Sequence, residues 1–220
     1  MLSSHTRISM SQVLSLFDDQ PVGVRAFVRA RHLLCPMMEI ERRVPPAGRI
    51  LELGCGHGLF SALMAAASPD RSVLGVDPSA AKIRVASGLT SRLPNVRFMQ
   101  GTVDDVVEAG LDAVAIVDVL YLLAPEEKER VLRQLLGLLA PGGRLVLKTN
   151  DTHPAWKYRW AKLQEQVMTG LGLTMGHGGL HFFSCAQTVA LLRRVGFREV
   201  QVAHLPTLLP YPHTLFTGLR

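Results

Sequence analysis

The feature that most constrains the fold is an apolar run, a glycine-rich turn and a second apolar run between residues 49 and 67. The first run, Arg49-Ile50-Leu51-Glu52-Leu53, has the composition of a buried strand. Glycines then occupy alternate positions at 54, 56 and 58, and an apolar helix is expected from Leu59 onward. Because glycine has no Cβ, it can adopt positive φ and let a ligand approach the backbone. The segment predicts an α/β protein that binds a ligand at the end of a strand.

The spacing of the glycines separates this turn from the dinucleotide-binding fingerprint. That fingerprint has its third glycine three positions after the second, where this chain has Leu59, and the third glycine comes early, at Gly58. A further apolar run, 73–76, ends in Asp77, about 20 positions after Gly56. An acid at this position can accept hydrogen bonds from both hydroxyls of an adenosine ribose. The pattern therefore predicts a cofactor that contains an adenosine.

Two phrases carry a resemblance to a known family. LELGCGHG at 51–58 and VLGVDPS at 73–79 resemble the first two motifs of the class I S-adenosylmethionine-dependent methyltransferases, and Ala140-Pro141-Gly142-Gly143 resembles the family's entry into its fifth strand. The resemblance covers roughly residues 45–205. It implies S-adenosyl-L-methionine as the cofactor and leaves the acceptor of the methyl group undefined.

Strands and helices are expected to alternate from residue 48 onward. Strands are predicted at 49–53, 72–76, 95–99, 112–117, 143–149, 197–204 and 211–218, and helices at 58–67, 79–91, 125–139, 154–169 and 186–195. Such alternation favours a Rossmann-like, doubly wound and mostly parallel sheet with helices on both faces. The resemblance implies seven strands, with the last one antiparallel. Residues 45–220 are predicted to form one domain.

Residues 1–44 are predicted to form a helical cap in front of that domain. Val24, Phe27 and Val28 repeat near helical spacing, Pro36 interrupts the pattern, and Pro45-Pro46 ends the segment. The cap either packs on the core, covers an acceptor pocket or touches a membrane.

Composition narrows the class of protein and its partners. The chain has 48% hydrophobic and 19% charged residues, and no apolar run approaches the roughly 20 residues of a membrane span. Three cysteines without a CxxC motif indicate neither a disulfide framework nor a thiolate metal site. We expect a cytoplasmic protein without a metal.

The formal net charge of +6 comes from scattered basic residues, not from a dense stripe with interleaved aromatic residues. A nucleic-acid partner is therefore not expected, and a small-molecule or lipid-like substrate is. Peripheral membrane contact and the oligomeric state are left open.

The resemblance assigns cofactor-binding roles to a set of residues. The set is Glu52, Gly54, Cys55, Gly56, His57, Asp77, Pro78, Gly101, Thr102 and Asp118. Glu52 and the glycine turn would hold the methionine end of the cofactor, Asp77 its ribose, and Pro78 its adenine. Purely structural alternatives are a Glu52 bonded to nearby amides and an Asp77 that closes a turn.

Catalytic candidates follow the fourth and fifth strands. Asp118 and Tyr121 are expected at the boundary between cofactor and acceptor. His153 could remove a proton from a hydroxyl acceptor, or it could simply precede the helix that begins at Pro154. Methyl transfer needs alignment of two atoms, with deprotonation where required, and no nucleophilic protein residue.

The segment beyond residue 153 supplies further candidates. The pair Trp156 and Trp160 could wall an acceptor pocket or pack in the core. The histidines His177 and His181 suit a mobile lid.

The predicted function is methyl transfer from S-adenosylmethionine to a small-molecule or lipid-like acceptor, with oxygen as the first choice of acceptor atom. One alternative is an NAD-dependent oxidoreductase, against which Leu59 in the third-glycine position speaks. The other is a non-catalytic protein that binds S-adenosylmethionine.

Overall fold

The computed structural model of the 220-residue chain describes residues 9–153, 180–205 and 212–220. The described helices are α1 (Met10–Ser15), α2 (Val22–Leu34), α3 (Met37–Glu41), α4 (Leu59–Ala67), α5 (Ala80–Ser87), α6 (Pro125–Leu138) and α8 (Cys185–Val195), with 3₁₀ helices η1 (Val103–Asp105) and η2 (Leu120–Leu122). The strands are β1 (Gly48–Leu53), β2 (Arg71–Asp77), β3 (Val96–Gln100), β4 (Leu111–Val117), β5 (Leu139–Asn150), β6 (Arg198–His204) and β7 (His213–Leu219).

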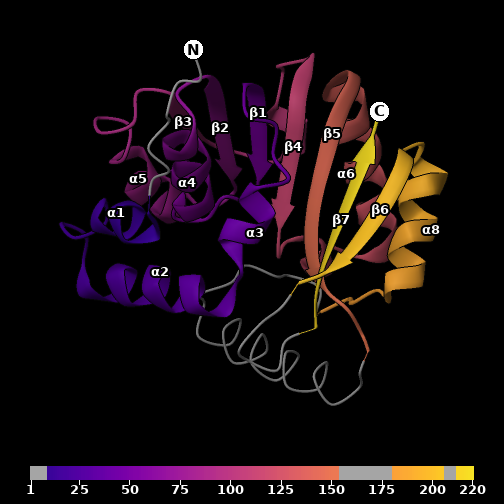
Figure 1. Ribbon diagram of the computed structural model, residues 1–220, viewed down its shortest axis with the longest axis horizontal. Helices are drawn as coiled ribbons and strands as arrows, with labels where there is room; N and C mark the ends of the chain where they lie inside the picture. Colours follow the sequence, from indigo (N-terminus) through magenta and orange to yellow (C-terminus); the bar gives the residue numbers. More distant parts are fainter. Residues whose placement is uncertain (1–8, 154–179, 206–211) are drawn as a thin grey trace, which may run out of the picture.

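The strands form one seven-stranded sheet in the order β3-β2-β1-β4-β5-β7-β6 (Figure 1). Strands β1 to β5 pair in parallel, whereas β7 is antiparallel to both β5 and β6. From β1 the next two strands, β2 and β3, extend the sheet toward one edge, and β4 then pairs with the other side of β1. The crevice at such a reversal, outside the carboxyl ends of the strands, is where open α/β sheets bind ligands.

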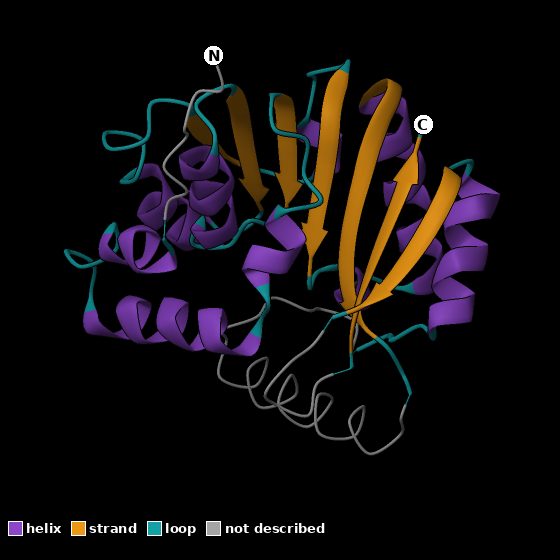
Figure 2. Ribbon diagram, viewed as in Figure 1, coloured by secondary structure: helices purple, strands orange, loops and turns teal. Residues whose placement is uncertain are grey.

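Helices cover both faces of the sheet and form two apolar cores (Figure 2). Neighbouring strand residues alternate between them: Ile50 lies in the core shared with α1 to α4, and Leu51 lies in the core shared with α6 and α8. Successive side chains of a strand point to opposite faces, so a parallel strand that is covered twice must be apolar throughout. The predicted architecture, including the antiparallel last strand, is confirmed.

Most element boundaries agree with the sequence-based expectation to within one or two residues, but two differ by four residues. Helix α5 ends at Ser87, before Gly88, instead of continuing to residue 91. Strand β5 begins at Leu139, because Leu139 already pairs with Leu111 before a register shift. The Pro-Gly-Gly segment predicted to precede the fifth strand therefore forms an irregular first part of β5.

The buried Arg71 of β2 binds helix α3 and the segment that follows it to the sheet. Its guanidinium donates to the carbonyl oxygens of Pro45 at 2.7 Å, Met64 at 3.0 Å and Val44 at 3.1 Å, and it pairs with Glu41 of α3 at 2.6 Å. The arginine side chain is only 4% exposed. Three carbonyl groups and one carboxylate thus share a single cation. The predicted domain boundary at residues 44–45 stays a prediction.

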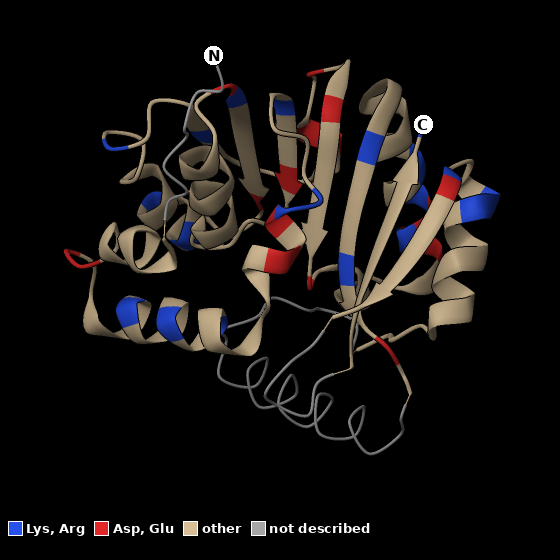
Figure 3. Cartoon of the chain, in the orientation of Figure 1, with Lys and Arg blue, Asp and Glu red and all other residues tan. Residues whose placement is uncertain are grey.

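Several sequence-based expectations fall outside the described residues, namely the helix at 154–169, the pair Trp156 and Trp160, and His177 of the expected lid. Within the described ranges no helix is long and apolar enough to cross a membrane. Basic side chains occur on several elements, α2 and α8 among them (Figure 3).

Candidate functional site

A cavity of about 670 Å³ opens at the carboxyl ends of β1, β2 and β4. Its volume falls within the range of about 300–1,000 Å³ that is usual for small-molecule sites. Helix α2 contributes Phe27, Val28, Arg31 and Leu34 to the wall, so the amino-terminal helices help to enclose the cavity. The switch point of the sheet and the helical cap together position this site.

The glycine turn between β1 and α4 forms one side of the cavity. Gly54, Gly56 and Gly58 all have positive φ, at 78°, 56° and 84°. A Cβ on Gly54 would overlap the side chain of Val119, whereas a Cβ on Gly56 would meet no atom within 4 Å. Gly54 is therefore required for packing, and Gly56 borders open space.

Asp77 at the end of β2 joins the second strand to this turn. Its Oδ2 accepts the amide N–H of Gly56 at 2.9 Å, and its Oδ1 accepts the amide N–H of Ser79 at 2.9 Å. The residue is buried, at 6% exposure, and lines the cavity. Each carboxylate oxygen can accept a second hydrogen bond, so both can still receive a donor from a ligand.

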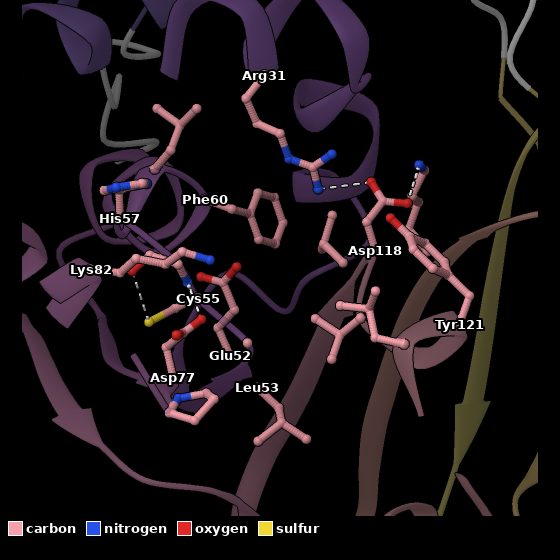
Figure 4. Close-up of a pocket in the computed structure, with 18 of the residues that line it drawn as sticks. Arg31, Glu52, Leu53, Cys55, His57, Phe60, Asp77, Lys82, Asp118 and Tyr121 are labelled. Carbon is pink, nitrogen blue, oxygen red and sulfur yellow. Dashed lines mark hydrogen bonds and ion pairs between the residues drawn. The ribbon is translucent and has the colours of Figure 1, made fainter. Parts of the chain in front are cut away.

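Glu52 of β1 is a buried acid beside the same turn. The hydroxyl of Ser61 on α4 donates to its Oε2, and Figure 4 shows its carboxylate inside the cavity near Asp77. Burial raises the pKa of Glu52 to about 7, although the Ser61 hydrogen bond and Arg31 oppose that rise. Glu52 therefore exists partly as a neutral acid near neutral pH.

The stability of the protein should fall with rising pH because of Glu52. Its ordinary pKa is 4.5, so between about pH 4.5 and pH 7 the folded state holds more protons than the unfolded state. Stability falls with pH wherever the folded state binds more protons. We expect Glu52→Gln to remove this component, as measured by urea unfolding across that pH range.

The pKa of Asp118 is shifted in the opposite direction, because neighbouring cations lower it. Its contribution to stability is therefore lost only as the pH falls below about 4, outside the range of this measurement. Parallel pH profiles for the wild type and Glu52→Gln would contradict the assignment for Glu52.

The opposite side of the cavity holds Asp118 between two cations. The Nζ of Lys148 on β5 lies 2.6 Å from its Oδ1, and Nη2 of Arg31 on α2 lies 2.8 Å from its Oδ2 (Figure 4). The contact with Arg31 is an ion pair that is not aligned as a hydrogen bond. Burial alone would raise the pKa of Asp118, but Lys148 and Arg31 hold it well below its usual range.

The backbone of Asp118 has the unusual φ of 59° for a non-glycine residue. Its amide donates to the carbonyl of Lys148 at 3.0 Å, so both backbone and side chain are tied to β5. Such strained positions concentrate at functional sites when the surroundings hold them in place.

A histidine that the sequence did not single out completes this side. His213 begins β7, lines the cavity, and has its Nδ1 3.0 Å from Oδ1 of Asn150, which also contacts Lys148. Burial and the nearby Lys148 lower the pKa of His213 to about 3, so the imidazole is neutral at physiological pH. Only the antiparallel pairing of Asn150 with His213 brings these residues together.

Most residues predicted from the sequence line one cavity. They are Glu52, Gly54, Cys55, Gly56, His57, Asp77, Pro78, Thr102, Asp118 and Tyr121. Tyr121 is buried and stacks on Phe182 with 4.7 Å between ring centroids. The roles of these residues stay predictions, but their proximity is a feature of the structure.

Two predicted residues are not among those that line the cavity. Gly101 donates its amide N–H to the carbonyl of Asp77 at 3.1 Å and so supports the neighbouring strand end. His153 is exposed, with its Nδ1 3.3 Å from the Thr152 hydroxyl. The geometry of the described residues thus gives no support to His153 as a base, and that role remains a prediction.

A model of the methyltransferase domain matches residues 50–143. The trans-aconitate 2-methyltransferase of Deinococcus radiodurans is 31% identical over 130 residues, covering 56% of this chain and 47% of the relative. The ubiquinone biosynthesis O-methyltransferase of Xanthomonas axonopodis pv. citri is 29% identical over 74% of this chain and 69% of the relative. The tRNA N(3)-cytidine methyltransferase METTL2 of Mus musculus is 28% identical over 70% of this chain and 41% of the relative.

Among solved structures, the S-adenosylmethionine-dependent methyltransferase SibL in its apo form superposes with a TM-score of 0.71 at 22% identity, covering 98% of this chain and 62% of SibL. The fold, the glycine turn and the family model all indicate a methyltransferase domain. Over residues 50–143 the chain matches the methyltransferase domain family, and it has the fold of the class I S-adenosylmethionine-dependent methyltransferases. It spans about half the length of the first curated relatives, at 47% and 44% of their residues.

The cavity fits the methyl donor that this family implies. Gly56 borders open space, so a ligand can reach the turn backbone. Asp77 keeps hydrogen-bonding capacity for a ribose. The buried Nδ1 of His57 has no hydrogen-bond partner within the described ranges, which leaves it available to a ligand.

Proposed function

We propose that this protein is a methyltransferase that uses S-adenosyl-L-methionine to methylate a small-molecule or lipid-like acceptor. The observation that carries the proposal is one cavity that joins the glycine turn and Asp77 on one side to Asp118 and Tyr121 on the other (Figure 4). The first side is suited to the donor, and the second leaves room for an acceptor.

The enclosure of the cavity favours a small acceptor. Helix α2 and the start of α3 close over the carboxyl edge of the sheet with apolar side chains, including Phe27, Leu34 and Met37. The ring of Phe27 lies 5.0 Å from that of His57, so the cap directly contacts the glycine turn. Apolar walls with a few placed polar groups are typical of small-molecule sites.

When bound, the cofactor supplies an activated methyl group. The protein would hold the donor and the acceptor in line for its transfer. Asp77 would orient the ribose, and the amides of the glycine turn would meet the amino-acid end. The apolar cap would exclude water. Asp118, fixed by Lys148 and Arg31, would place its backbone and that of Val119 beside the acceptor.

For the acceptor atom we propose oxygen. A hydroxyl acceptor must lose its proton, and the neutral His213 lies within the cavity wall, although its low pKa makes it a weak base. His153 is the candidate from the sequence. A phenol, an amine and a thiol of similar shape, offered in parallel, distinguish the acceptor atoms.

The test is transfer of a radiolabelled methyl group from S-adenosylmethionine. Purified protein is incubated with a panel of phenols, hydroxy acids and fatty acids, with total RNA as a separate acceptor. We expect label in a small-molecule product. Label in RNA alone, or cofactor binding without transfer to any acceptor, would overturn the proposal and favour an RNA methyltransferase or a non-catalytic binding protein.

A further inference from the structure

The Arg31–Asp118–Lys148 cluster carries more positive than negative charge. Two cations share the one carboxylate of Asp118, while the neighbouring His213 is neutral and Glu52 is partly protonated near neutral pH. Lys148 is 1% exposed at its side chain and also contacts Asn150. Among the described residues, Asp118 is thus the one carboxylate in direct contact with both cations, and a buried charge is costly unless it is paired.

Arg31 is the member of the cluster that can reach a ligand. Its side chain is 27% exposed, it lines the cavity, and its contact with the described residues is the single ion pair to Asp118. A guanidinium has five N–H donors in a planar fork that suits a carboxylate. The donors that do not face Asp118 are therefore available to a ligand in the cavity.

Arg31 lies in the part of the cavity that is expected to hold the acceptor, not the cofactor. In Figure 4 the Arg31–Asp118 pair lies on the Tyr121 side of the cavity, away from Asp77 and Cys55 of the glycine turn. The amino-acid end of the cofactor is expected at that turn, where backbone amides can hold it. A ligand group bound by Arg31 would lie in the other part of the cavity, near the apolar side chains of α2.

We propose that Arg31 binds a carboxylate of the acceptor, which makes the substrate a small apolar molecule with one acid group. The inference rests on the proposed function, because it assumes that the second part of the cavity holds an acceptor. Asp118 and Lys148 act as positioning residues for Arg31, since Asp118 pairs with the guanidinium and Lys148 pairs with Asp118.

The test uses protein saturated with S-adenosylhomocysteine and two probes of nearly equal shape, phenylacetate and phenylacetamide. We expect the wild type to bind the acid about 10-fold or more tightly than the amide, as is usual for hydrogen bonds between charged groups. Arg31→Gln should abolish this preference, and Arg31→Lys should retain part of it, since it keeps the charge but loses the fork.

Arg29→Gln is the matched control, because Arg29 lies on the same helix, is 58% exposed and pairs with Asp18. It should keep the full preference for the acid. Equal affinities of the wild type for both probes, or no binding of phenylacetate, would overturn the proposal. Thermal unfolding of each variant confirms that the protein is folded.

A second comparison separates the two sources of a carboxylate. If Arg31 instead binds the carboxylate of the cofactor, Arg31→Gln will weaken S-adenosylhomocysteine but not 5′-methylthioadenosine, which lacks the amino-acid end. That result overturns the acceptor assignment and leaves the proposed function intact. Failure of the wild type to bind S-adenosylhomocysteine would instead count against the proposed function itself.

Discussion

Replacing Arg71 by Met is expected to lower the free energy of unfolding by about 3–5 kcal/mol, the usual effect of removing one partner of a buried ion pair. Methionine roughly preserves the length and apolar stem of the side chain but removes every donor. Glu41 and the carbonyl groups of Val44, Pro45 and Met64 would then lose their partner. Urea unfolding monitored by circular dichroism measures the change.

Arg97→Met is the matched control for this substitution. Arg97 also lies on a strand and pairs with an acid, Glu108, but its side chain is 62% exposed. An exposed ion pair is worth about 0–1 kcal/mol, so the control should unfold almost as the wild type does. If Arg71→Met matched that small effect, Arg71 would not be what holds α3 and the segment after it to the sheet.

Asp77→Ala is expected to weaken binding of S-adenosylhomocysteine by about 1.5–3 kcal/mol, the range for hydrogen bonds to charged groups, or about 10- to 150-fold. The carboxylate is buried at the cavity wall, and it also accepts the N–H of Gly56 and so fixes the turn. The substitution would remove the proposed ribose contact and also the hydrogen bond that fixes the turn. Isothermal titration calorimetry gives the affinities.

Asp112→Ala controls for the loss of a strand-end carboxylate. Asp112 accepts the amide N–H of Arg49 at 2.7 Å, near the amino ends of β1 and β4 and outside the cavity lining. Its removal should affect stability and leave affinity for the cofactor unchanged. A folded Asp77→Ala variant with wild-type affinity would show that the carboxylate is only a turn aspartate.

The first part of the candidate site could be predicted from the sequence because its signal is local. The glycines at 54, 56 and 58 and the acid at Asp77 follow two adjacent strands at fixed spacing, and β1 pairs directly with β2. Short-range geometry therefore determines which of these residues meet. The alternation of strands and helices predicted the sheet for the same reason.

The second part depends on contacts between distant segments. Arg31 reaches Asp118 from a helix near the amino terminus, and His213 reaches Asn150 through antiparallel pairing of β7 with β5. No spacing rule relates these positions in the sequence. His153, by contrast, is a candidate because it follows the fifth strand closely in the sequence, but its side chain is exposed and does not line the cavity.

The most direct test of the central claim is a calorimetric titration of the purified protein with S-adenosylhomocysteine, and with NAD in parallel. A glycine turn that lacks the third glycine of the dinucleotide fingerprint, followed by Asp77 as the proposed ribose ligand, predicts binding of S-adenosylhomocysteine and none of NAD. Folded protein that binds NAD, or that fails to bind S-adenosylhomocysteine, would contradict the assignment of this cavity to a methyl donor.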